Sequence, residues 1–180
     1  MPLHDQRHVA SSCQLEISLK ASKLIAAALL LLFALAPARS ETREQWIEWG
    51  TRIHGAFGAF IPVGIRIGLD ARERLKAATR DLSVTYFNGD KPPCPCVADG
   101  IMIATQASPG QGTLQMASEK APQGSMATIV IRNRKSGESL KYTISDEWLP
   151  TILGWNKLDA AGRFDAAMAA EHLFRSEPAP

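Results

Sequence analysis

The sequence has few cysteines and no long apolar run, and each shortage excludes a class of protein. Of its three cysteines, only Cys94 and Cys96 lie beyond residue 40, and one residue separates them. Such a pair cannot cross-link distant parts of a fold, so the chain is not a disulfide-stabilised scaffold. The apolar run Leu24–Ala36 has thirteen residues, whereas a helix that spans a bilayer needs about 20. The run is therefore too short for a typical membrane span.

Residues 41–180 have no formal net charge. The whole chain has 20 Lys and Arg residues and 18 Asp and Glu residues, for a formal net charge of +2. Four of these bases and two of these acids lie in residues 1–40, which leaves sixteen of each in residues 41–180. A basic surface of the kind that binds nucleic acid or anionic lipid is therefore not expected.

Residues 1–40 have the pattern of a secretory signal peptide. Lys20 and Lys23 precede the apolar run, and the small residues Ala38 and Ser40 occupy the positions that a signal peptidase inspects. We expect cleavage between Ser40 and Glu41, export to the periplasm, and no stable membrane insertion afterwards. An uncleaved membrane anchor is the alternative.

Residues 41–180 are long enough for one domain with its own core. Apolar periodicity and turn residues predict helices over residues 41–54, 62–78 and 97–107, strands over 82–87, 114–119, 126–133 and 139–144, a short helix from 145 and a longer one over 156–175. A frayed tail is expected over 176–180. The order of these elements predicts an α+β fold with an antiparallel sheet packed against helices. Gly64 and Gly68, four residues apart, predict close approach of a neighbouring element or of a ligand.

Several catalytic signatures are missing. The chain has no Ser-centred nucleophile motif, no paired-histidine helix motif and no dinucleotide fingerprint after a strand. The loop Pro109–Thr113 contains two glycines but no following Lys-Ser or Lys-Thr, and it comes before a predicted strand instead of a helix. We interpret this loop as a turn and not as a phosphate site.

The residues that carry chemistry are His54, Cys94 and Cys96. Two thiols at positions i and i+2 of an extended segment point the same way, so both sulfurs can face one ion, and an imidazole can complete three ligands. Three protein ligands leave one position open for water or for a small molecule. The set suits zinc, and thiolates also suit copper.

Other interpretations of these residues stay open. His54 falls at a predicted helix end, where it can neutralise the helix dipole or bond to a carbonyl. Cys94 and Cys96 can form a disulfide that takes part in thiol–disulfide exchange, although the intervening Pro95 argues against the required turn. They can also be unreactive thiols. His172, far along the last predicted helix, is expected on a solvated face.

Three motifs together resemble a known family. They are His54-Gly55 before a turn of small residues, Cys96 followed by Asp99-Gly100-Ile101, and a Gly-x-Gly-x-Leu loop at residues 110–114. This pattern is similar to that of the family of proteins like the E subunit of formylmethanofuran dehydrogenase, over about residues 54–142. The resemblance implies an α+β domain that tends to form a homodimer and that in several members binds a metal, usually zinc. It also implies that Asp99 orients a ligand, although an acid there can equally favour the helix N-terminus.

The chain departs from the family pattern at several polar positions. Ala56 stands where the family carries a second histidine, Gly58 where it carries a cysteine, and Ala59 where it carries a proline; Met102 and Gln111 replace a glutamine and a lysine. Cys94 is a candidate substitute for a lost ligand. The family name does not imply formylmethanofuran oxidation here, because that chemistry resembles the work of other subunits with molybdenum or tungsten and iron–sulfur centres, for which this chain has no set of ligands.

The sequence therefore predicts an exported metal-binding domain, with a zinc-like divalent ion held by His54, Cys96 and Cys94 and supported by Asp99. Its role would be that of an accessory or small-molecule-binding module. The alternatives are a thiol–disulfide redox protein that uses Cys94 and Cys96, or a structural module that has lost its site. The sequence identifies neither the ligand nor a reaction.

Overall fold

The computed structural model describes residues 41–78 and 80–180. The predicted signal peptide over residues 1–40 lies outside the described residues. Residues 41–180 form one compact unit. Within the described ranges, no helix is both long enough and apolar enough to cross a membrane.

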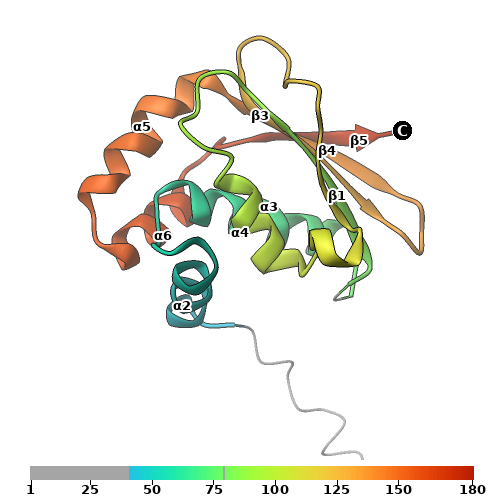
Figure 1. Cartoon of the computed structure of the whole chain (residues 1–180), viewed down its shortest axis with the longest axis horizontal. Coiled ribbons are helices and arrows are strands. Elements are labelled where there is room, and N and C mark those ends of the chain that lie inside the picture. The colour runs from blue at the N-terminus through green and yellow to red at the C-terminus, as the bar shows by residue number, and fades with distance from the viewer. Residues whose placement is uncertain (1–40, 79) are drawn as a thin grey trace, which may run out of the picture. The chain divides into compact units, whose positions relative to one another are not determined.

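The unit is built on a five-stranded mixed sheet with strand order β2-β1-β3-β4-β5 (Figure 1). Its antiparallel part consists of β1 (Leu82–Asn88), β3 (Ser125–Asn133), β4 (Ser139–Ser145) and β5 (Arg175–Ala179). The short edge strand β2 (Leu114–Met116) instead pairs parallel with β1. The α+β prediction is thus confirmed, but the sheet is not purely antiparallel. The reason is that helix α4 (Val97–Thr105) connects β1 to β2, and a strand–helix–strand crossover returns the chain in the same direction.

One face of the sheet carries the main core. Alternate residues of β1 are buried, as the period of two predicts. The register aligns them with buried side chains of β3 and β4, and together these strands contribute Leu82, Val84, Tyr86, Ala127, Ile129, Ile131, Leu140, Tyr142 and Ile144 to this face. Helix α3 (Phe60–Arg74) and α4 cover that face with residues such as Val63 and Ile101.

A second apolar cluster lies on the other side of α3 and α4. There, Ile61 and Ile65 of α3 pack with Trp46 of α2 (Arg43–His54), and side chains of α6 (Ala160–Ala169) border the cluster. Helices α3 and α4 therefore form a central layer between the sheet and α2 (Figure 1).

The two central helices cross at glycines. A Cβ added to Gly64 would lie 2.9 Å from Gly100 Cα, and a Cβ added to Gly100 would lie 2.9 Å from Gly64 Cα. One turn further along, Gly68 faces Ala104. From the first contact (64 with 100) to the second (68 with 104), the residue numbers rise along both helices. The two helices are therefore parallel, and their N-termini lie at the same end. The predicted close approach at Gly64 and Gly68 is confirmed, with a helix as the neighbour.

The C-terminal region differs most from the prediction. After β4, the chain forms short 3-10 turns over Asp146–Trp148 and Trp155–Lys157, helix α5 (Leu149–Gly154), α6, and then β5. The predicted helix over 156–175 is too long, because Arg66 of α3 donates hydrogen bonds to the carbonyls of Ala167 and Ala170 and so caps α6. The predicted frayed tail is wrong, because residues 175–179 pair with the edge of β4.

The tyrosines give a pH test of this packing. The chain has two, Tyr86 and Tyr142, and both are buried. Burial raises the pKa of each phenol, and for Tyr142 the hydrogen bond to Asp70 raises the pKa further. Because the folded pKa lies above the unfolded value of about 10, the two phenols contribute stability that is complete below about pH 10 and is lost as the pH rises toward the folded values.

We therefore expect almost no tyrosinate absorbance from the folded protein one pH unit above the ordinary tyrosine pKa of about 10. The same protein in denaturant should show the absorbance of two tyrosinates there. A native titration near the ordinary pKa would contradict the burial of these side chains.

Candidate functional site

The site begins where α2 ends. A capping box formed by Thr42 and Gln45 starts this helix, and Gly55, with φ of 88°, ends it. His54 is the last helical residue, and its side chain is 30% exposed. Its predicted place at a helix end is confirmed, but its ring bonds to Asp99 of another helix instead of to a nearby carbonyl.

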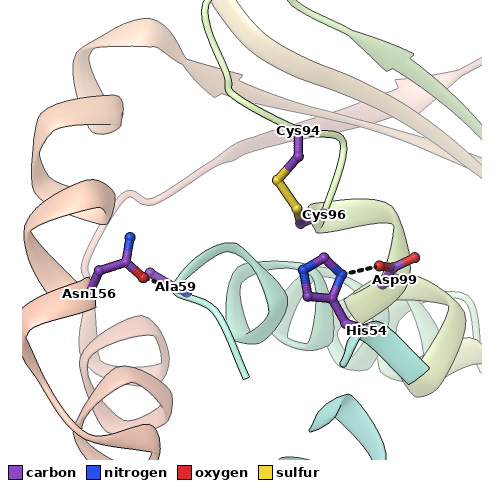
Figure 2. Close-up of a disulfide and its surroundings, with 6 residues drawn as sticks. All are labelled: His54, Ala59, Cys94, Cys96, Asp99 and Asn156. Carbon is purple, nitrogen blue, oxygen red and sulfur yellow. Dashed lines mark hydrogen bonds and ion pairs between the residues drawn. A yellow bond between two sulfur atoms is a disulfide. The ribbon is translucent and has the colours of Figure 1, made fainter. Parts of the chain in front are cut away.

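Asp99 lies in the first turn of α4 and faces His54 (Figure 2). Its Oδ2 atom is 2.7 Å from His54 Nδ1. A carboxylate accepts, so Nδ1 carries the proton of this hydrogen bond, and in the neutral tautomer that fits this bond Nε2 keeps its lone pair. Among the described residues, Nε2 has no hydrogen-bond partner. The hydrogen bond thus fixes the imidazole and leaves one nitrogen available.

Cys96 immediately precedes α4, three residues before Asp99. It forms a disulfide with Cys94, and the two Cα atoms are 5.3 Å apart. Cys96 is 7% exposed, whereas Cys94 is partly exposed. Pro95 was expected to oppose this pairing, but it is compatible with it. Its carbonyl accepts a hydrogen bond of 2.8 Å from the Ala98 amide, so the bend between the cysteines is already the start of the helix.

The parallel arrangement of α3 and α4 gives the site a favourable electrostatic setting. Both helices begin at the end of the layer where Cys96 and Asp99 lie. A helix N-terminus carries a partial positive charge, so negative charge on a sulfur or a carboxylate is stabilised there. Asp99, an acid in the first turn of α4, is favoured by the same field.

The turn after His54 is held by the C-terminal region. Arg163 donates a hydrogen bond of 2.7 Å to the Phe57 carbonyl, and the Ala59 amide donates one of 3.3 Å to Asn156 Oδ1 (Figure 2). Both partners are about a hundred residues away in sequence, and no sequence motif indicated them. Ala56, where the family pattern has a histidine, is an exposed member of this turn.

An apolar groove of about 370 Å³ lies between α2 and α4. Trp49 and Ile53 contribute from α2, and Met102 and Ile103 contribute from α4; Gln106, Ala107 and Ser108 complete the lining. Ile53 is 49% exposed although it is apolar. Two lining residues of the groove are near the site in sequence, because Ile53 directly precedes His54 and Met102 follows Asp99 by one helical turn.

With Cys94 and Cys96 joined in a disulfide, the candidate ligands do not form a metal centre. No group of three or more His, Cys, Asp or Glu side chains suited to a metal ion occurs within residues 41–78 and 80–180. Cys94 and Cys96 are joined in a disulfide, and metals are bound by thiolates and not by a disulfide. His172, predicted on a helix, lies instead in the exposed turn before β5, where its carbonyl accepts from Trp148.

The chain was compared with known proteins. The model of the family described as "FmdE, Molybdenum formylmethanofuran dehydrogenase operon" matches residues 53–176. That range begins one residue before His54 and includes both cysteines and Asp99. A search of curated proteins gave no match.

Proposed function

Because the chain belongs to the FmdE family, we propose that residues 41–180 form a metal-binding domain whose ligands are His54, Cys96 and Cys94. Zinc is the first candidate. The observation that carries the proposal is the 2.7 Å contact between His54 Nδ1 and Asp99 Oδ2. A carboxylate that holds one ring nitrogen while the other stays free is the usual support of a metal-bound histidine.

Metal binding belongs to the dithiol form of the site. The sulfurs of Cys94 and Cys96 are close enough to bond, so after reduction they remain close enough to bind one ion. The N-termini of α3 and α4 favour negative charge near Cys96, which is the charge that a thiolate ligand carries. Ala56 and Gly58 have replaced two family ligands, and Cys94 supplies one donor in return.

Three protein ligands would leave a coordination position open to solvent or to a small molecule, and a zinc ion there would polarise what it binds. The groove between α2 and α4, lined by Ile53 and Met102 among others, offers an apolar surface for the body of such a molecule. We therefore include small-ligand binding in the proposal, as an accessory function in an exported, periplasmic protein. The family resemblance adds a homodimer as the proposed assembly. Neither nucleic acid nor a membrane is a proposed partner.

Elemental analysis of the protein, purified without affinity-tag histidines, tests this proposal. After reduction and incubation with Zn²⁺ under argon, the protein should retain stoichiometric zinc through gel filtration. The oxidised protein should retain much less. Replacement of Asp99 with asparagine should weaken zinc binding about 10- to 100-fold, because the imidazole loses its orienting carboxylate.

Substitution of the ligands should have larger effects. The variants Cys96→Ser and His54→Ala should lose zinc at concentrations that saturate the wild type. His172→Ala is the matched control, since His172 lies in an exposed turn, and it should bind zinc as the wild type does. A reduced wild-type protein that holds no zinc, with both thiols free to react, would refute the proposal.

A further inference from the structure

We propose that the Cys94–Cys96 disulfide is an exchangeable one, which oxidises an accessible dithiol by way of a mixed disulfide on Cys94. This activity goes beyond metal binding and uses the oxidised form of the site. Three features carry the proposal. They are the small loop that the bond closes, the unequal exposure of the two cysteine residues, and the proline-rich chain around them.

The Cys94–Cys96 bond contributes little to the stability of the fold. A disulfide stabilises a fold mainly by closing a loop in the unfolded chain, and the effect grows with loop length. Here one residue separates the partners, so the bond restrains almost none of the unfolded chain. The surrounding elements are held by other contacts, such as the crossing of Gly64 and Gly100. The fold is therefore expected to persist when the bond is broken.

The two sulfurs are not equivalent. Cys94 lies in the connection from β1 to α4 and is partly exposed, whereas Cys96 is 7% exposed and is the N-cap residue of α4. An incoming thiolate can reach a sulfur only from solvent, so Cys94 is the sulfur attacked. Cys96 is then the leaving sulfur, and its negative charge forms at a helix N-terminus, where it is stabilised.

The connection that carries Cys94 is anchored and stiff. At its start, the Gly89 amide donates a hydrogen bond of 2.9 Å to the Met126 carbonyl, and Lys91 forms an ion pair of 2.9 Å with Asp146. Pro92, Pro93 and Pro95 then fix the backbone around Cys94. Such a backbone keeps the two sulfurs near one another after reduction, so the bond can form again.

The exchange balances in two steps. The first substrate thiolate attacks Cys94 Sγ, the Cys94–Cys96 bond breaks, and its electron pair goes to Cys96 Sγ. The second substrate thiolate attacks the substrate sulfur of the mixed disulfide, and Cys94 leaves as a thiolate. Two electrons pass to the protein, the two substrate thiols give up two protons, and the two protein thiols take up two. The products are a substrate disulfide and the protein dithiol.

The wild-type protein gives the first test. Oxidised protein is mixed with an excess of a reduced synthetic peptide that carries two cysteines, and in parallel with reduced glutathione, both with a chelator present. For each protein dithiol formed, the first reaction should yield one peptide disulfide and the second one glutathione disulfide, which takes two glutathione molecules. The preferred reductant distinguishes a peptide from a small thiol as the source of electrons. Retention of the Cys94–Cys96 bond in the folded protein against both reductants would overturn the proposal.

Matched variants test which sulfur is attacked. Cys96→Ser leaves Cys94 free, and Cys94→Ser leaves Cys96 free. With glutathione disulfide as the probe, Cys96→Ser should form a mixed disulfide at least about 10-fold faster than Cys94→Ser, because Cys96 is buried. Equal rates, or a faster reaction at Cys96, would refute the assigned roles. The chelator removes any bound metal, so these results do not depend on the proposed zinc site. Failure of zinc binding would in turn leave them unchanged.

Discussion

Replacing Gly64 or Gly100 with alanine is expected to lower the free energy of unfolding by at least about 3 kcal/mol, which is at the high end for an overpacked core. A Cβ on Gly64 would collide with the Val97 carbonyl and lie 2.8 Å from the Ile101 amide nitrogen. A Cβ on Gly100 would meet the corresponding backbone atoms of Ile61 and Ile65. Backbone atoms cannot rotate away as a side chain can, so the helices must separate.

Thermal and denaturant unfolding measure the effect. A loss of this size should lower the melting temperature by about 10 °C in a domain of this length. Gly154→Ala is the matched control, because Gly154 ends α5 with helical dihedral angles and no neighbour within 4 Å. Alanine should be neutral there or stabilise by up to about 1 kcal/mol. Equal stability of Gly64→Ala and Gly154→Ala would contradict the close crossing of α3 and α4.

Removal of Arg175–Pro180 should have a comparable effect, a loss of about 3 kcal/mol or more, since each backbone hydrogen bond contributes about 1 kcal/mol net. These residues include β5, which pairs with β4 from Thr143 to Ser139. The truncation also removes the hydrogen bond from Arg74 to Ser176 and the ion pair between Lys141 and Glu177. It leaves β4 as an unprotected edge, so the truncated protein should also aggregate more readily.

Deletion of Pro180 alone is the control, because the pairing of β5 ends at Ala179. Denaturant unfolding and light scattering on the two truncated proteins separate the effects of stability and of association. A six-residue truncation that is as stable and as monodisperse as the full chain would show that the tail is frayed, as the sequence alone predicts.

The local elements were predictable because their signals are local. The apolar spacing within α2, the alternation of Leu82, Val84 and Tyr86, and the turn at Gly137 each act over a few residues. β5 has no such signal. Its sequence, RSEPA, is polar and contains a proline, and it becomes a strand because the edge of β4 and the side chain of Arg74 lie beside it. Tertiary contacts of this kind do not show in a sequence pattern.

The direction of β2 follows from the order of the elements around it. The sequence predicts a strand, a helix and a strand in succession over residues 82–119. That order favours a parallel pair, because the helix carries the chain back to the starting end of the first strand. The expected antiparallel sheet is present in β1, β3, β4 and β5, and the crossover through α4 adds β2 to it as a parallel edge strand.

The candidate site was predictable in its members and less so in its contacts. The family pattern identified His54, Cys96 and Asp99, and the structure brings His54 and Asp99 to 2.7 Å. Spacing alone could not decide between free thiols and a disulfide at Cys94 and Cys96, and the structure has the disulfide. Asn156 and Arg163 were missed because their contacts with the His54 turn cross about a hundred residues of sequence.

The glycine crossing constrains how a lineage of such domains can change. The backbones of α3 and α4 touch at Gly64 and Gly100. A side chain at either position therefore requires the facing helix to shift. Gly58 is under no such constraint, because a Cβ added there would meet no atom within 4 Å beyond its own chain neighbours. Gly58, where the resemblance implies a family ligand, can therefore change by itself, whereas the glycines of the crossing cannot. A distant member of such a family is therefore expected to keep the helix crossing even where it has lost ligand residues.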